Sequence, residues 1–80
     1  MLTAAQIKAA RALVDWSQPQ LAEASGLSMP TIRRMEGPIG PGRSTAANVE
    51  AVQRALEEAG VVFFDAGETR PGGPGVRLRS

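Results

Sequence analysis

The sequence predicts a mainly α-helical domain in which four helices are followed by a short β-hairpin. Three observations lead to this prediction: a helix-start pattern that recurs along the chain, glycines that follow the expected helix ends, and a change to strand-like patterning after residue 60. With 80 residues the chain forms one small domain. A domain of this size buries only about 60% of its unfolded surface, so dimerisation is a natural source of further stability.

The first two helices begin with a reciprocal capping pattern. Thr3 precedes Gln6 by three residues, and Ser17 precedes Gln20 in the same way. In each pair the hydroxyl can accept a hydrogen bond from the first turn, while the glutamine returns to the backbone of the cap. Pro19 lies in the first turn of the second helix, where its missing N–H has no intrahelical acceptor. The first helix is therefore expected at about residues 3–14, and the second after residue 17.

The third and fourth helices have simpler starts. Ser28 can cap the third helix, with Pro30 in its first turn, and the fourth begins near Ser44 or Thr45. A Gly/Pro-rich loop at residues 37–42 separates these two helices. Gly26 and Gly37 follow the second and third helices and suit a left-handed conformation, and Gly60 ends the fourth helix.

Apolar residues at helical spacing identify the faces that should enter the core. In the first helix they are Ile7, Ala10, Leu13 and Val14, and in the fourth, at about residues 45–59, they are Val49, Val52, Leu56 and Ala59. Residues 61–64 are β-prone, and residues 76–79 alternate apolar with basic side chains. Residues 1–60 are thus expected to be helical, and residues 61–80 to form a hairpin or a sheet that spans two chains.

Composition argues against several classes of function. The chain has no cysteine and no histidine, which excludes a disulfide scaffold and a Cys/His metal site. The serines mostly occupy cap positions and no phosphate-binding loop is present, so we expect neither an enzyme nor a cofactor. No apolar segment reaches the roughly 18 residues of a membrane span, and the N-terminus does not read as a signal peptide. We therefore expect a cytoplasmic protein without a membrane partner.

The distribution of charge points to one local surface. The net charge is only +1, but Arg33, Arg34 and Arg43 lie close together in the sequence with a single acid, Glu36, among them. A basic patch on a near-neutral domain is a weak indication of phosphate binding. The adjacent arginines are also compatible with an ordinary solvated helix face.

The segment SQPQLAEASGLSMPTIRRMEG has the spacing of a helix-turn-helix, with about seven residues in each helix and Gly26 in the turn. It resembles the lambda-repressor-like helix-turn-helix family, which includes phage repressors, Cro proteins and XRE-type regulators. The resemblance spans about residues 5–60, with the motif itself at about residues 17–36. It implies a four-helix fold and a transcriptional regulator, expected to be a repressor, that binds double-stranded DNA sequence-specifically.

Helical geometry then assigns the side chains of the third helix. At 100° per residue, Ile32 and Met35 point inward, and Arg34 lies nearly opposite them, where an arginine can pair bidentately with guanine O6 and N7. Beside it we expect the Thr31 hydroxyl to hydrogen-bond a base and the exposed Met29 to offer an apolar contact, and the resemblance implies a phosphate or base-edge contact for Ser28 at the helix start. The expected base contacts are Ser28, Met29, Thr31 and Arg34.

Other expected contacts concern the DNA backbone and the support of the third helix. Arg33 is expected to meet a phosphate, and the resemblance assigns phosphate contacts to Gln18 and Arg43 as well. The loop that carries Arg43 departs from the short form that is common in the family. Family members also pair an arginine of the first helix with a glutamate that ends the recognition helix, which here implies an ion pair between Arg11 and Glu36.

Specificity and partners follow from the small size of the recognition surface. A single domain makes few base contacts, so we expect a homodimer on a pseudo-palindromic operator with half-sites roughly 34 Å apart. Residues 61–80 are candidates for the dimer contact, because an apolar strand is a poor lone edge. Two alternatives stay open at this point. The chain can be an antitoxin or anti-regulator that binds a protein through residues 61–80, or a helical scaffold without DNA binding.

Overall fold

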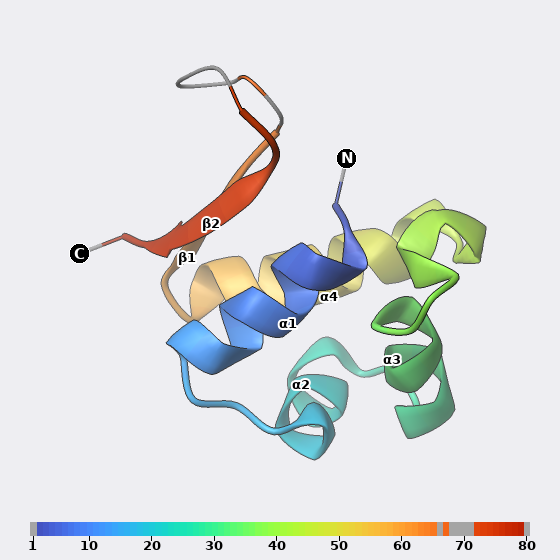
Figure 1. Ribbon diagram of the computed structural model, residues 1–80. Coiled ribbons are helices and arrows are strands. Elements are labelled where there is room, and N and C mark those ends of the chain that lie inside the picture. The colour runs from blue at the N-terminus through green and yellow to red at the C-terminus, as the bar shows by residue number, and fades with distance from the viewer. Residues whose placement is uncertain (1, 66, 68–71, 80) are drawn as a thin grey trace.

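The computed structural model describes residues 2–65, 67 and 72–79. Within these residues the chain is mainly helical and ends in a two-stranded hairpin (Figure 1), which confirms the predicted class. The elements are α1 (Ala4–Leu13), α2 (Gln18–Ser25), α3 (Met29–Met35), the 3₁₀ helix η1 (Gly40–Arg43), α4 (Ala46–Glu58), β1 (Val61–Phe64) and β2 (Gly75–Leu78). No helix in the described part is both long and apolar enough to cross a membrane.

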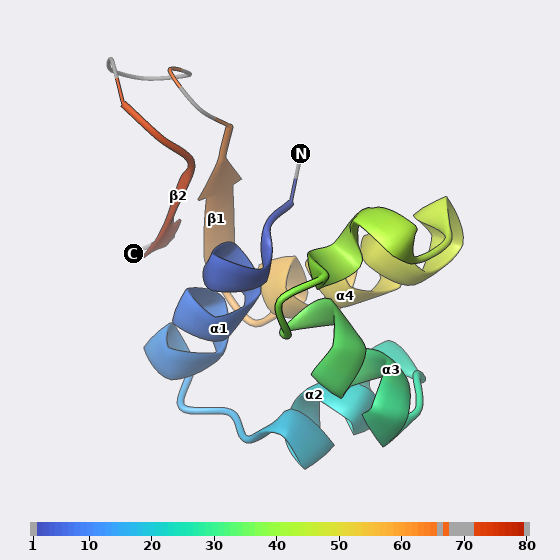
Figure 2. The same cartoon turned by 45° about the vertical axis from the view of Figure 1, so that its right-hand side comes forward.

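The core lies between α4 and the helices that pack against it (Figure 2). Helix α4 contacts α1 and α2, while α3 contacts α2 and η1. The predicted apolar faces mostly enter this core, whose buried side chains are Leu2, Ile7, Ala10, Leu21, Ala22, Ile32, Met35, Val52, Ala55, Leu56 and Val61. Leu13 was expected in the core but is 40% exposed. It is the last residue of α1, and the residues of α1 that enter the core lie in the earlier turns of that helix.

The capping predictions for the first two helices are confirmed. The backbone N–H of Gln6 donates to Thr3 Oγ1 at 3.1 Å, and the N–H of Thr3 donates to Gln6 Oε1 at 2.9 Å. The same exchange joins Ser17 and Gln20 at the start of α2. Of the two candidates for the start of the fourth helix, Thr45 is the cap, since its hydroxyl accepts from the first turn of α4.

The segment between α3 and α4 differs from the prediction in two respects. Part of the expected loop is the 3₁₀ helix η1, in which Pro41 supplies a φ angle already suited to a helical turn. Gly37 does not adopt the expected left-handed conformation, which occurs at Gly40 instead, with φ of 74°. Position 37 is nevertheless tight, because an added Cβ would lie 3.2 Å from the carbonyl oxygen of Arg33 and the backbone would have to shift slightly.

Strands β1 and β2 are antiparallel neighbours within one chain. Val61 pairs with Leu78, and Phe63 pairs with Val76. Val61 is fully buried, and Phe63 and Val76 pack against the core, so these pairs form the inner face of the hairpin. Of the two arrangements that the sequence left open, the structure contains the intramolecular hairpin.

The side chain of Gln6 connects α1 to the hairpin. Its Nε2 donates to the carbonyl oxygens of Phe64, at 2.9 Å, and Gly75, at 3.1 Å. Gln6 is almost completely buried. The same residue therefore caps α1 with its oxygen and holds both strands with its nitrogen.

We expect Gln6→Glu to lower the free energy of unfolding by about 2 kcal/mol, because a carboxylate cannot donate to the carbonyl oxygens of Phe64 and Gly75. The carboxylate keeps the oxygen that caps α1, so the change isolates the contact with the hairpin. Urea denaturation measures the loss, which should shrink in acid, where a protonated carboxyl regains one donor. The control is Gln20→Glu, because Gln20 occupies the same position in the capping box of α2, whose start is exposed. Equal losses in the two variants would contradict the assigned role.

Candidate nucleic-acid interface

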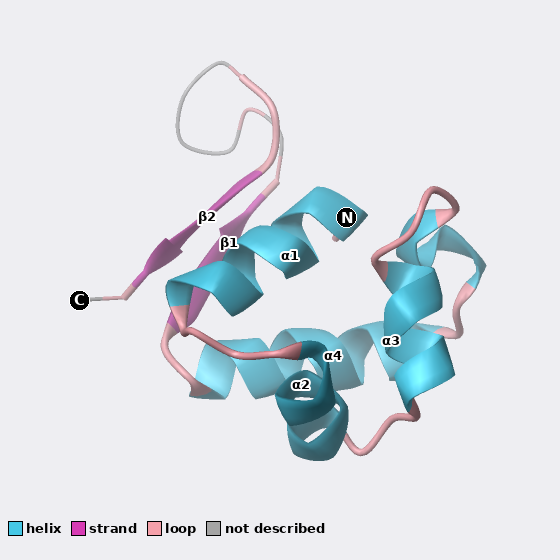
Figure 3. Cartoon of the chain, turned by 60° about the horizontal axis from the view of Figure 1, so that its bottom comes forward, coloured by secondary structure: helices cyan, strands magenta, loops and turns pink. Residues whose placement is uncertain are grey.

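Helices α2 and α3 are joined by a three-residue turn, residues 26–28, and pack against each other (Figure 3). Gly26 has a left-handed φ of 76°, as predicted, and its N–H donates to the carbonyl oxygen of Ala22 at 2.9 Å. The N–H of Leu27 donates to the same oxygen at 3.1 Å. These bonds close the end of α2 and turn the chain directly into α3.

Helix α3 separates an apolar inner face from a basic outer face. Ile32 and Met35 are 1% and 0% exposed and belong to the core, whereas Arg33 and Arg34 are exposed. Neither guanidinium group has a hydrogen bond or an ion pair with any residue that the structure describes. Both arginines therefore keep all their donors available for a partner outside the chain.

The two hydroxyl groups at the start of α3 bind each other. Ser28 Oγ and Thr31 Oγ1 are 2.9 Å apart, and Ser28 Oγ also accepts from the N–H of Thr31 at 3.4 Å. Ser28 is exposed and Thr31 is half-buried. Sequence analysis predicted the cap but not the pairing of the hydroxyls, which fixes the two candidate base contacts relative to each other.

Met29 is less accessible than expected. Its side chain is half-buried and packs against the core rather than standing free on the surface. As the first residue of α3, it lies close to the turn from α2, where apolar surface is covered. Only part of Met29 is left for contact with another molecule.

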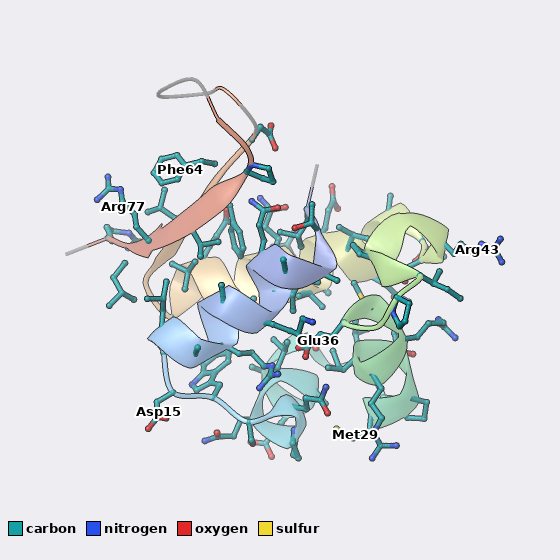
Figure 4. All side chains as sticks on the ribbon, viewed as in Figure 1. Asp15, Met29, Glu36, Arg43, Phe64 and Arg77 are labelled. Carbon is teal, nitrogen blue, oxygen red and sulfur yellow. The ribbon has the colours of Figure 1, made fainter. Side chains whose placement is uncertain are left out.

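The C-terminal end of α3 is held by an ion pair. Glu36 follows the last residue of the helix, and its carboxylate accepts from Arg11 Nε at 2.6 Å and from Arg11 Nη2 at 2.7 Å. The side chain of Glu36 is 3% exposed and that of Arg11 is 19% exposed, and Figure 4 shows Glu36 in the interior between the helices. Hydrogen bonding to Glu36 raises the pKa of Arg11 above its ordinary value. The structure thus contains the expected partly buried ion pair.

Gln18 also bonds to this ion pair, a contact that was not predicted from the sequence. Its Nε2 donates to Glu36 Oε1 at 3.1 Å, so the first residue of α2 is tied to the end of α3. Arg11 extends the network in another direction, because its Nη1 donates to the carbonyl oxygen of Trp16 at 3.0 Å. The only sign in the sequence was a glutamine at the first position of α2, whose side chain can reach a neighbouring helix.

Arg43 lies on η1, which packs against α3. Its side chain is exposed and points away from the body of the protein (Figure 4). Like the arginines of α3, it has no hydrogen bond or ion pair with a described residue. The structure therefore brings a third unpaired cation next to the element that carries Arg33 and Arg34.

No protein-family model and no curated protein matches the chain. The geometry of α2, α3 and η1 is therefore the basis on which a function can be assigned. Among the described residues, no group of three or more Asp and Glu side chains is placed to hold a metal ion. The unpaired guanidinium groups are the chemically distinctive feature of this surface.

Proposed function

We propose that the protein is a lambda-repressor-like helix-turn-helix regulator that binds double-stranded DNA with α3 in the major groove. One observation carries the proposal: α3 buries Ile32 and Met35 and turns the Arg34 side chain outward, without a partner among the residues that the structure describes. A helix that only filled the core would gain nothing from an outward arginine in its last turn. A guanidinium group in that position matches the O6 and N7 acceptors of guanine.

The hydroxyls at the start of α3 supply a second type of contact. Ser28 and Thr31 share one hydrogen bond, and each oxygen retains capacity for another. The Thr31 methyl group also suits the C5-methyl of thymine. Ser28, Thr31 and Arg34 are the assigned base contacts, with Met29 contributing its uncovered part.

The phosphate backbone is assigned to the cations beside α3. Arg33 and Arg43 are exposed, their side chains bond to no described residue, and the elements that carry them contact each other. Gln18 acts with them through the N–H of its amide that is not bonded to Glu36. Because Glu36 holds both Arg11 and Gln18, one carboxylate fixes the phosphate-binding residue relative to α3.

Fluorescence anisotropy with the DNA upstream of the protein's own gene tests this proposal. We expect tighter binding to this duplex than to a scrambled duplex of the same composition. Each cation that meets a phosphate contributes about 0.9 to the slope of log K against log salt. Arg43→Ala should therefore lower the slope by about 1 per bound chain and weaken both duplexes alike. Absence of binding even at low salt would refute DNA recognition.

A further inference from the structure

A hollow of about 310 Å³ opens where the N-terminal segment, η1 and the first turns of α4 come together (Figure 2). Leu2, Pro41 and Val49 form its apolar walls. Leu2 and Pro41 are buried and Val49 packs against the core, so the fold itself fixes these walls. Small-molecule sites in proteins begin at about this volume. At the ~30 Å³ that one molecule occupies in liquid water, the hollow has room for roughly ten non-hydrogen atoms.

Two small residues keep the hollow open. Gly42 lines it, and a Cβ added there would meet no described atom within 4 Å beyond its chain neighbours. The φ angle of Gly42 is not left-handed, so neither the backbone conformation nor a close contact requires a glycine at this position. Ala46, the first residue of α4, lines the hollow with a single methyl group. The chain therefore leaves this volume unfilled although Gly42 has room for a side chain.

The hydroxyl group of Ser44 is a buried polar group without a partner. Its Oγ is almost inaccessible to solvent and has no hydrogen bond with a described residue. Ser44 does not cap α4, because Thr45 takes that role by accepting from the N–H of Asn48 at 3.1 Å. Most buried polar groups in proteins are hydrogen-bonded, so this hydroxyl points to a partner outside the chain. Ser44 lines the hollow, and its Oγ changes direction by rotation about χ1 alone.

Glu50 sets the charge of the hollow. It is the one charged residue among those that line it, and its side chain is exposed and bonds to no described residue. The nearest cations along the chain, Arg43 and Arg54, do not line the hollow. The N-terminus of α4 favours an anion, but the helix dipole is equivalent to only about half an elementary charge. The full negative charge of Glu50 therefore suits the hollow to a cation and opposes a carboxylate.

We propose that this hollow binds a small organic amine. The apolar part of the amine packs against Leu2 and Val49, while its ammonium group donates to Ser44 Oγ and pairs with Glu50. No lining residue belongs to α2 or α3, so the site adds a second binding function and does not depend on the proposed recognition of DNA. It adjoins the proposed DNA interface only through η1, which also carries Arg43.

NMR titration of the isotope-labelled chain without DNA tests the site. The probes are hexylamine, cyclohexylamine and phenethylamine, each beside the alcohol and the carboxylate that carry the same hydrocarbon group. For at least one amine we expect saturable shifts of the amide resonances of Gly42, Ala46 and Val49, with a Kd of about 1 mM or below. The matched alcohol should bind at least about tenfold more weakly, because it lacks the charge that pairs with Glu50. The matched carboxylate should bind more weakly still.

Two variants separate the hydroxyl from the charge. Ser44→Ala should weaken amine binding at least about tenfold, yet it should not lower the stability of the chain, since the lost hydroxyl has no partner there. Glu50→Gln should bring the affinity for the amine close to that for the alcohol. The control is Glu58→Gln, because Glu58 is exposed at the last residue of α4 and does not line the hollow. This variant should bind the amine as wild type does.

A third variant blocks the hollow. Ala46→Leu enlarges one wall and should reduce the binding of every probe, while circular dichroism verifies that all variants remain folded. Absence of saturable binding by any amine, shifts confined to other parts of the chain, equal binding of amine and carboxylate, or unchanged binding by Ser44→Ala would each overturn the proposal. DNA binding by a chain that binds no amine would leave the proposed function standing without this site.

Discussion

Glu36→Ala should lower the free energy of unfolding by about 3 kcal/mol, the range found when one partner of a buried ion pair is removed. The carboxylate is nearly inaccessible and accepts three hydrogen bonds, two from Arg11 and one from Gln18. Its loss leaves the Arg11 charge largely covered by protein and without a counter-ion. Chemical denaturation of wild type and variant measures the difference.

A double-mutant cycle separates the ion pair from the effect of truncation. Arg11→Met and Glu36→Leu together should cost much less than the sum of the two single changes, because an apolar pair removes the unpaired charge. Glu50→Ala serves as the matched control, since Glu50 is exposed on α4 and should contribute little. Additive losses from the two single variants would contradict the assigned coupling between α1 and the end of α3.

Arg34→Ala should weaken binding to the cognate DNA by about 1–3 kcal/mol, the contribution of one bidentate contact to a guanine. The free energy of unfolding should change little, because the Arg34 side chain is exposed and bonds to no described residue. The preference for cognate over scrambled DNA should fall along with the affinity. Anisotropy titrations against both duplexes, at one fixed salt concentration, measure the two quantities.

Two companion variants make the Arg34 result specific. The Arg54 side chain is also exposed and has no bond within the described part of the chain, but it lies on α4, so Arg54→Ala should leave the preference between duplexes unchanged. Arg34→Lys retains the charge and loses the planar pair of donors, so it should keep phosphate-level affinity but lose discrimination. If Arg34→Lys discriminates as well as wild type, Arg34 acts through charge alone and the assigned base contact is wrong.

Local rules predicted most of the helical framework. The Thr3 and Ser17 capping patterns involve residues three positions apart, so the sequence contains both partners of each interaction. Gly26 was predictable for the same reason, because the left-handed end of α2 depends on one residue and its neighbours. The Gly37 prediction failed because the choice between Gly37 and Gly40 depends on how η1 packs against α3.

Contacts between distant segments were beyond these rules. Gln6 reads as a capping residue, and nothing in its neighbourhood indicates that its other amide atom holds the hairpin. The link between Gln18 and Glu36 likewise depends on the packing of α2 against α3. The Arg11–Glu36 ion pair was predicted only from the resemblance to a known family, because two residues so far apart in the sequence form no local pattern.

Selection of bound duplexes from a random DNA library, performed with wild type and with Arg34→Ala, tests most directly whether α3 reads DNA sequence. We expect wild type to enrich a defined motif that contains guanine, and the variant to lose the requirement for one base pair in each half-site. Enrichment of no motif, or of the same motif by both proteins, would contradict recognition of bases by Arg34 and α3.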